Sequence, residues 1–292
     1  MAKLGMILVT GATGHQGGAV ARELINHGHQ IKAMTRHPES DKAKELKKLG
    51  AELITGDLDN PQSLEKALTG VWGVFAVQNT WEAGVEKEEE QGKRIAEIAK
   101  AKGVKHYVYT SVGSAQRHTG IPHFDNKFRV EEKVCSLGLP SYTIIRPVFF
   151  MENWLSPWFK PAIDQGNIMV PLRSTTRLQM IAVRDIGKYG LWAFENHEKL
   201  NGKAIDIAGD SLTMPETAEI ISKVSGNDIG FQQIPIEEVR KSSEDFALMF
   251  EWFDKIGYDA DIPARAKESG IKPTTFAEWA ASVSWKKSPV AV

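Results

Sequence analysis

Residues 6–18 read Met-Ile-Leu-Val-Thr-Gly-Ala-Thr-Gly-His-Gln-Gly-Gly. The apolar and β-branched residues at the start of this stretch predict a buried strand, and the amphipathic segment 19–25 behind it predicts a helix. Between the two stand three glycines at three-residue spacing, Gly11, Gly14 and Gly17. A strand, a glycine turn and a helix in this order are typical of a loop that binds the pyrophosphate of a dinucleotide.

Each glycine has a distinct expected role in such a loop. Gly11 lets the chain turn sharply out of the strand, because glycine tolerates positive φ. Gly14 has no side chain that would hold a pyrophosphate away from the backbone, and Gly17 lets the helix pack closely on its strand. The first N–H groups of the helix then face the anion.

Composition narrows the class of protein. The 292 residues carry a formal net charge of −1, so the molecule as a whole offers no attraction to nucleic acid or to an anionic membrane. The first residues lack the pattern of a secretory signal, and no apolar run approaches the roughly 20 residues that span a bilayer. We therefore expect a cytoplasmic protein without nucleic-acid or membrane partners.

Cysteine and histidine usage argues against disulfide and metal chemistry. Cys135 is the only cysteine, which excludes an internal disulfide, and we expect it to be a small buried side chain in a helix. The eight histidines are scattered and form no ligand motif, so no metal site is predicted.

Strands and helices alternate through the first half of the chain. Strands are predicted at 30–35, 51–55, 71–77, 106–111 and 141–146, and helices at 40–49, 61–68 and 86–102. The charge run that opens the last helix is interpreted as a solvated helix face. Repeated βα units predict an α/β fold of the Rossmann type, a doubly wound parallel sheet with ligands at the carboxyl ends of its strands.

The alternating pattern loosens after residue 147. Strands are predicted at 178–183 and 203–208, and helices at 184–195, 215–225, 236–253 and 275–284. We expect a dinucleotide-binding domain formed by 1–147 and 179–210, and a smaller, mostly helical domain formed by 148–178 and 211–292. The tail 288–292 is expected to be frayed.

The end of the second strand bears on the choice of coenzyme. An acid about 20 residues after the glycines binds the ribose hydroxyl in NAD-binding proteins, but this chain has Arg36 there. An arginine can grip a 2′-phosphate with two charge-assisted hydrogen bonds, which predicts NADP(H). The alternative is that Arg36 is a solvated residue at a strand end.

Polar residues follow the next two strands. Asp57 could accept a hydrogen bond from the adenine amino group, or it could be a turn residue before the next helix. Gln78 and Asn79, after the fourth strand, are expected beside the glycine loop and the coenzyme ribose, although either could cap a loop.

The glycine spacing and the element order resemble the short-chain dehydrogenase/reductase superfamily in its atypical branch. Catalytic members of that superfamily have a Tyr-x-x-x-Lys motif, whose lysine holds the ribose and whose phenol supplies the proton. No tyrosine of this chain has a lysine four residues later. His123 occupies the tyrosine position and Lys127 keeps the lysine position.

Five segments together carry a more specific resemblance. They are Thr10–Gly18, Thr35-Arg36-His37-Pro38, Gln78-Asn79-Thr80-Trp81-Glu82, His123-Phe124-Asp125-Asn126-Lys127 and Phe150-Met151-Glu152-Asn153. In this order they resemble the NmrA-like family, especially its HSCARG-type members. The chain departs from that subgroup at Glu90, where the subgroup tends to carry a basic residue, and this puts one nucleotide contact in doubt.

The resemblance implies NADP(H) bound by the glycine loop, Arg36, the end of the fourth strand, Lys127 and the segment 150–153, to which the turn after the third strand is added. The expected set is Gly11, Ala12, Thr13, Gly14, His15, Gln16, Gly17, Arg36, Asp57, Leu58, Gln78, Asn79, Lys127, Phe150 and Asn153.

Two functions are compatible with this resemblance. The first is a sensor of the NADPH/NADP⁺ balance, whose surface a partner protein recognises according to coenzyme occupancy. The alternative is an NADPH-dependent reductase of a quinone, enone or similar flat apolar substrate, with Lys127 or His123 as the group that protonates or polarises it.

Several aromatic side chains and His123 have two interpretations each. The residues Trp81, Phe149, Phe150, Trp154 and Trp158 could wall a substrate pocket or pack in the core. His123 could equally be hydrogen-bonded at a helix start. The sequence leaves the oligomeric state open.

Overall fold

The computed structural model describes residues 4–286, so the predicted frayed tail at 288–292 lies outside the described residues. The chain divides into two compact units. Unit 1 comprises 1–118, 122–146 and 186–206, and unit 2 comprises 119–121, 147–185 and 207–292. Within residues 4–286, no helix combines the length and apolar character that crossing a bilayer requires.

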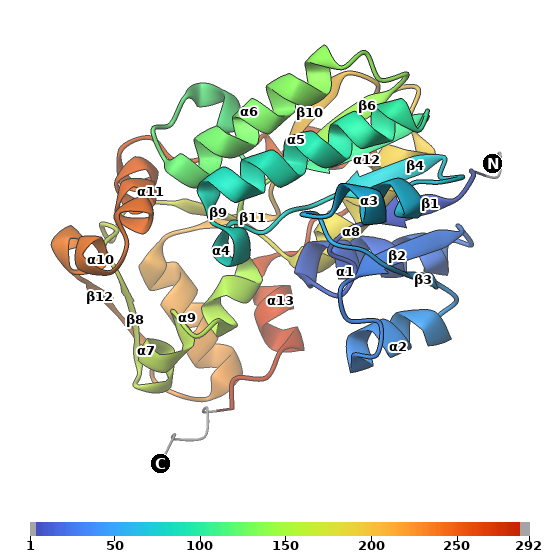
Figure 1. Cartoon of the computed structure of the whole chain (residues 1–292). Coiled ribbons are helices and arrows are strands. Elements are labelled where there is room, and N and C mark those ends of the chain that lie inside the picture. Colours follow the sequence, from blue (N-terminus) through green and yellow to red (C-terminus); the bar gives the residue numbers. More distant parts are fainter. Residues whose placement is uncertain (1–3, 287–292) are drawn as a thin grey trace. The chain divides into compact units, whose positions relative to one another are not determined.

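Unit 1 is built on a seven-stranded sheet with the order β10-β6-β5-β4-β1-β2-β3 (Figure 1). Its strands are β1 (Ile7–Val9), β2 (Ile31–Thr35), β3 (Glu52–Thr55), β4 (Gly73–Ala76), β5 (His106–Thr110), β6 (Tyr142–Pro147) and β10 (Lys203–Ile207). The ladders from β6 to β3 are parallel. Strand β1 pairs with β2 on one side and β4 on the other, so the strand order reverses there, which is where doubly wound sheets bind ligands. The predicted fold class is confirmed.

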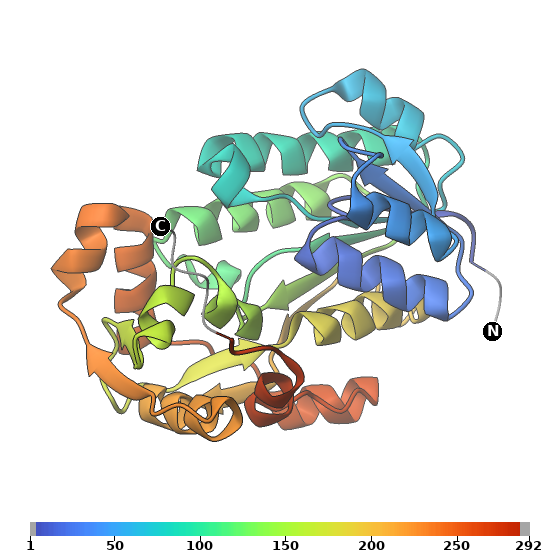
Figure 2. The same cartoon turned by 90° about the horizontal axis from the view of Figure 1, so that it is seen from below.

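Helices cover both faces of this sheet (Figure 1). They are α1 (His15–Asn26), α2 (Asp41–Lys48), α3 (Pro61–Ala67), α4 (Thr80–Ala83), α5 (Val85–Ala101), α6 (Pro122–Ser136) and α8 (Val183–Glu195), with a 3₁₀ turn η1 (Ala115–Arg117). Helices α5 and α6 lie on one face, and α1 and α8 lie side by side on the other (Figures 1 and 2). The close contact of α1 with α8 requires glycine, because a Cβ on Gly187 would lie 2.8 Å from the carbonyl oxygen of Ala19.

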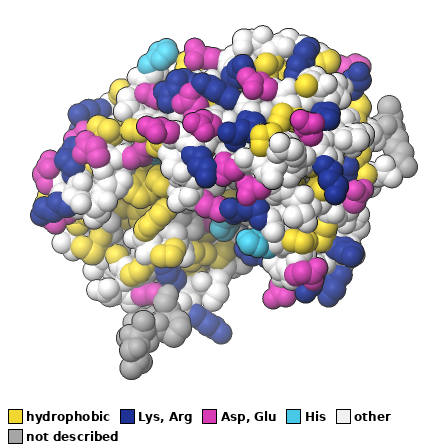
Figure 3. Space-filling model, in the orientation of Figure 1, with side chains coloured by type: hydrophobic (Ala, Val, Ile, Leu, Met, Phe, Trp, Pro, Cys, Tyr) yellow, Lys and Arg dark blue, Asp and Glu magenta, His cyan; other side chains and the backbone are white. Residues whose placement is uncertain are grey.

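The core of unit 1 forms where apolar faces of α5 and α6 meet the sheet. Leu8, Val74 and Ile95 are fully buried in this cluster, and Val130 of α6 packs with them. Burying such side chains stabilises the fold by about 1.5–3 kcal/mol each. The outer face of the same helices is charged, and Figure 3 shows positive and negative side chains interspersed over it.

Unit 2 combines two small sheets with short helices. One sheet has the order β11-β9-β7 and the other pairs β12 with β8. The strands are β7 (Phe149–Phe150), β8 (Asn167–Val170), β9 (Leu178–Ile181), β11 (Asp210–Leu212) and β12 (Gly230–Gln233). The helices are α7 (Lys160–Asp164), α9 (Met214–Ser225), α10 (Ile236–Ser242), α11 (Glu244–Lys255), α12 (Ile262–Ser269) and α13 (Phe276–Ser282), with a 3₁₀ segment η2 (Met151–Leu155).

Two details of unit 2 differ from the sequence analysis. The predicted helix 236–253 is wrong, because Ser243 is extended (φ −160°, ψ 115°) and its side chain caps a new helix by accepting from the Phe246 N–H. The segment 179–185 lies in unit 2, since β9 pairs with β7 and β11. The sequence predicts residues 179–210 in the dinucleotide-binding domain, whereas 179–185 and 207–210 lie in unit 2.

Candidate coenzyme site

The glycine loop between β1 and α1 has the geometry that its sequence predicts. Gly11 has φ +55°, the left-handed conformation that favours glycine. A Cβ on Gly17 would lie 2.4 Å from the carbonyl oxygen of Gly11 and 2.5 Å from that of Thr10, so only glycine permits this approach of helix to strand. The start of α1 therefore packs directly on the backbone of residues 10 and 11.

The outer side of the loop is open. Gly14 is exposed and precedes the first helical residue of α1, and no side chain among residues 4–286 caps that helix start. The first turn of α1 also carries no acidic residue. An uncapped, positively polarised helix start beside an exposed glycine fits the pyrophosphate of a dinucleotide.

Four predicted loop residues have different degrees of exposure. Ala12 is buried, Thr13 and Gln16 are half-buried, and His15 is exposed. The Gln16 side chain is tied to the end of β5, because its Oε1 accepts from Thr110 Oγ1 at 2.7 Å. Gln16 therefore joins the loop to the neighbouring strand end.

Arg36 lies directly after β2, and its guanidinium is already paired. Its Nη2 donates to Oε1 of Glu82 in α4, and the two side chains are 50% and 52% exposed. The hydrogen bond that Arg36 donates to Glu82 raises the pKa of Arg36, and the nearby carboxylates of Asp57 and Asp59 contribute to the same shift. The sequence analysis predicted the arginine but not its carboxylate partner.

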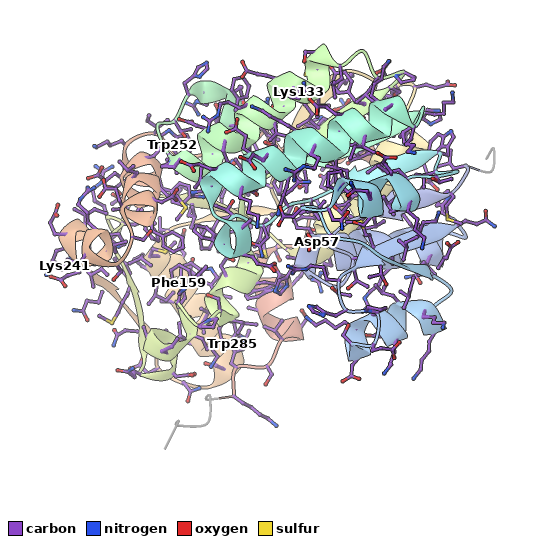
Figure 4. The ribbon with its side chains drawn as sticks, in the orientation of Figure 1. Asp57, Lys133, Phe159, Lys241, Trp252 and Trp285 are labelled. Atoms are coloured by element: carbon purple, nitrogen blue, oxygen red, sulfur yellow. The ribbon has the colours of Figure 1, made fainter. Side chains whose placement is uncertain are left out.

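Asp57 and Leu58 form the turn after β3. The Asp57 carboxylate accepts a hydrogen bond from the Asp59 N–H at 2.9 Å (Figure 4). Asp57 therefore acts as a turn residue, one of the two roles that the sequence allows for it. The Leu58 carbonyl accepts from Arg94 Nη1 of α5 at 2.8 Å. Helix α5 also holds this loop through Lys87, whose Nζ lies 2.8 Å from Asp59 Oδ2.

The two polar residues after β4 point in different directions. Gln78 is buried, and its amide atoms have no hydrogen-bond partner within residues 4–286. A Cβ on Gly92 of α5 would lie 3.4 Å from Gln78 Oε1, so this amide packs against α5. Asn79 is exposed and caps α4, its Oδ1 accepting from the Trp81 N–H at 3.1 Å.

Lys127 is bound to a buried carboxylate. Its Nζ donates to Oε1 of Glu88 in α5, while Oε2 of Glu88 accepts from Thr80 Oγ1 and from Asn126 Nδ2, the latter at 2.8 Å. Glu88 is 1% exposed. Burial raises the pKa of Glu88, but the charge and hydrogen bond of Lys127 outweigh burial, and the net direction is downward.

His123 lies one helical turn before Lys127 on α6 and is buried. Its ring lies 5.1 Å from that of Trp81 and 4.8 Å from that of Phe124, centroid to centroid. Trp81 is 49% exposed, so the indole contacts the imidazole and still remains accessible to solvent.

Three consecutive residues of α4 therefore contact three groups of the candidate site. Thr80 bonds the carboxylate that holds Lys127, Trp81 packs on His123, and Glu82 pairs with Arg36. The cap from Asn79 and the positive φ of Gly84 (+85°) limit this helix to four residues. Helix α4 thus brings together residues that lie far apart in the sequence.

Other predicted residues lie in unit 2. Phe150 ends β7 and Asn153 lies in η2; both are half-buried. Of the aromatic residues considered for a pocket, Phe149 and Trp154 are buried in the core of unit 2 and contact each other at 5.6 Å between ring centroids. Trp158 is 56% exposed and contacts Phe246 at 5.1 Å.

Two sequence interpretations are wrong in the structure. Cys135 is in α6 as predicted, but it is exposed rather than buried. The charge run of α5 is not uniformly solvated, because Glu88 shares the buried stripe of that helix with Gln91 and Ile95. Glu88 lies three residues before Gln91 and seven before Ile95, a spacing that puts all three on one face of a helix. This spacing is the sequence signal that could have identified Glu88 as a buried residue. Glu90 is exposed, and its Oε2 lies 3.8 Å from Arg94 Nη2.

Metal binding has no geometric support within the part of the chain described, since no three His, Cys, Asp or Glu side chains there are grouped to hold an ion.

Comparison with known proteins gives consistent matches over nearly the full length. An NmrA-like family domain-containing protein of Dictyostelium discoideum is 30% identical over 307 residues, which cover 96% of this chain and 98% of that protein. The structure of NmrA, a negative transcriptional regulator in complex with NADP, matches with a TM-score of 0.78 at 22% identity, covering 96% of this chain and 95% of that one. An NADPH-dependent quinone oxidoreductase of Escherichia coli matches with a TM-score of 0.77 at 25% identity, covering 95% and 99%.

The sequence pattern of the NmrA-like family matches residues 3–280, which include both the glycine loop and the Lys127 segment. This chain belongs to the NmrA-like family.

Proposed function

We propose that this chain binds NADP(H) in unit 1 and acts as a sensor of the NADPH/NADP⁺ balance. The observation that carries the proposal is the position of α4, whose residues 80–82 contact the groups around Lys127, His123 and Arg36. A coenzyme that engages any of these groups changes a contact of α4. A partner protein that binds the α4 surface then has one affinity for the protein in which the coenzyme engages these groups and another for the protein in which it does not.

The residues present fit the coenzyme. The uncapped start of α1 and exposed Gly14 suit the pyrophosphate, and Arg36 suits a 2′-phosphate. Lys127 of α6 would hold a ribose, and Glu88 is its counter-ion.

The proton chemistry of carbonyl reduction has weak support in this chain. His123 stands at the position of the catalytic tyrosine. Tyr107 and Tyr109 are buried, and burial raises the pKa of both phenols. Lys127 is engaged by Glu88, so its charge is already compensated. These features favour a binding role over catalysis.

The first test measures coenzyme binding and the response of α4. Calorimetry should give a saturable signal with NADPH, and hydrogen exchange of the peptide spanning residues 78–86 should change on binding. NADP⁺ serves as the comparison. A sensor requires the two coenzyme forms to differ either in affinity or in their effect on this peptide. No heat with either form would refute coenzyme binding, and no change in the peptide would refute sensing through α4.

Recognition by a partner protein is tested with two tryptophan variants. Trp81→Ala should weaken coenzyme-dependent retention of a partner, whereas Trp158→Ala removes another exposed tryptophan in unit 2 and should not. Equal losses in both variants would argue against α4 as the recognised surface. The oligomeric state is measured on the same samples, because an added subunit would also change retention.

The second candidate function is reduction of a quinone, an enone or a similar flat apolar substrate by NADPH. It is favoured by the half-exposed Trp81 ring in contact with His123 and by the similarity to the Escherichia coli quinone oxidoreductase. When bound, NADPH supplies the hydride, and His123 or Lys127 would polarise the substrate.

The two candidates are separated by a turnover screen of NADPH oxidation with quinones and enones. Turnover well above background would favour the reductase, and none would favour the sensor. The role of Lys127 is best tested with Lys127→Met in the Glu88→Gln background, because the double variant leaves no unpaired buried charge. An unchanged rate in His123→Ala would remove that residue from the mechanism.

A further inference from the structure

The partner of Arg36 bears on coenzyme selectivity. We infer that Glu82 is a specificity-determining residue that competes with the coenzyme's 2′-phosphate for Arg36 and thereby narrows the preference for NADP(H) over NAD(H). The inference rests on the proposed binding of a nicotinamide coenzyme in unit 1.

Glu82 is the carboxylate in direct contact with the guanidinium. It accepts from Arg36 Nη2 across 46 residues of sequence. The charges of Asp57 and Asp59 also raise the pKa of Arg36, but less than Glu82 does. Asp59 is itself compensated by Lys87 at 2.8 Å and by Arg94 at 3.7 Å. Among residues 4–286, the ion pair of Arg36 is therefore with Glu82.

The register of α4 fixes Glu82 in this place. Its helix starts at the Asn79 cap, and Trp81, the residue before Glu82, packs on His123. Moving Glu82 away from Arg36 requires either a new side-chain rotamer or displacement of α4. The carboxylate is thus held next to the group expected to bind the phosphate.

The two coenzymes place different demands on this pair. A 2′-phosphate carries more than one negative charge and needs the same guanidinium N–H groups that Glu82 uses, so it must displace a carboxylate that also repels it. A ribose hydroxyl is uncharged and requires no such exchange. Glu82 therefore weakens the binding of NADP(H) and leaves that of NAD(H) nearly unaffected.

The test is Glu82→Gln, with dissociation constants for NADPH and NADH measured by titration of coenzyme fluorescence or by calorimetry. An exposed ion pair contributes up to about fivefold in an equilibrium constant, and loss of repulsion adds to this. We expect NADPH to bind roughly 3- to 10-fold more tightly and NADH to change by less than about 2-fold.

Glu86→Gln is the matched control, because it removes the same charge from an exposed position four residues away. It should change the ratio of the two affinities by less than about 2-fold. Adding Arg36→Ala to Glu82→Gln tests the route of the effect. When the double variant is compared with Arg36→Ala alone, Glu82→Gln should give little gain in NADPH affinity, because the competition acts through the guanidinium.

Three outcomes would overturn the inference. They are an unchanged affinity ratio in Glu82→Gln, an equal gain in Glu86→Gln, and a full gain that persists without Arg36. If neither coenzyme binds the unaltered protein or any variant, the proposed function fails instead, and the two failures are therefore distinguishable.

Discussion

Replacing Lys127 with alanine should destabilise unit 1 in a manner that depends on pH. The substitution leaves Glu88, which is 1% exposed, without its counter-ion. Breaking a buried ion pair by removing one partner typically costs about 3–5 kcal/mol. Thr80 and Asn126 still donate hydrogen bonds to the carboxylate, so we expect about 2–3 kcal/mol at pH 7.5. The unfolding temperature should fall by about 5–10 °C.

The pH dependence follows from the direction of the pKa shift. In the unaltered protein the pKa of Glu88 is lowered, because Lys127 outweighs burial. Its stabilising contribution is therefore present above the ordinary glutamate pKa and is lost only as pH falls through the lowered value. Without Lys127, burial dominates and the pKa rises above the ordinary value. The deficit of the variant should then shrink between pH 7.5 and pH 5.5, because Glu88 takes up a proton.

The assay is thermal unfolding at pH 7.5 and pH 5.5. Lys133→Ala is the matched control on the same helix, where Lys133 pairs with Glu97 at 2.5 Å in a partly exposed position (Figure 4). It should cost less than about 1 kcal/mol at both pH values. Adding Glu88→Gln to Lys127→Ala should recover part of the loss at pH 7.5. A Lys127→Ala deficit equal to that of the control, or independent of pH, would refute the buried-pair account.

Three further predictions concern packing, acid stability and thiol access. Gly17→Ala should lower the unfolding temperature by several degrees and weaken NADPH binding at least tenfold. Gly18→Ala, whose Cβ would lie 3.1 Å from the nearest backbone oxygen, should have smaller effects on both. Thermal unfolding and calorimetry compare the two variants, and equal effects would contradict the packing argument. Burial lowers the pKa of His106 to about 3, so its neutral form stabilises the fold above pH 6.5, and this contribution is lost as the pH falls below that value. His106→Gln should therefore reduce the slope of the unfolding free energy against pH between pH 6.5 and 4. An unchanged slope would exclude His106 as its source. Native protein should react with a thiol reagent at Cys135 without denaturant, and protection until unfolding would contradict its exposure.

The sequence was sufficient for the fold because its signals are local. The β1 strand, the glycine loop and α1 occupy consecutive residues, and the glycine conformations follow from backbone sterics. Element boundaries agree within one or two residues for most of unit 1. The predicted helix at 86–102 is observed as Val85–Ala101, for example.

The errors in unit 2 come from short elements. The Ser243 cap that separates α10 from α11 occurs within a continuous helical pattern, and a side-chain cap outweighs that pattern at a single residue. Helix α12, opened by the Asp261 cap, and the strands β11 and β12 were not predicted, because elements this short show little periodicity.

The candidate site was only partly predictable, because its pairings depend on packing between distant elements. The positions of Arg36 and Lys127 could be inferred from the strand end and the motif spacing. Their partners Glu82 and Glu88 lie 46 and 39 residues away and meet them only when α4, α5 and α6 are assembled. Coenzyme contacts of the individual residues stay predictions.

The interleaved division of the chain has a consequence for synthesis and for fragment work. Unit 1 receives its edge strand β10 only at residues 203–207, after the whole of 147–185 has been made. A nascent polypeptide therefore exposes the open edge of β6 until more than two thirds of the protein has left the ribosome, which is a hazard for aggregation. Truncation after β6 would leave this edge permanently unpaired. Because each unit consists of segments that are separated in the sequence, expressing one unit alone requires joining its segments, and a single truncation does not produce it.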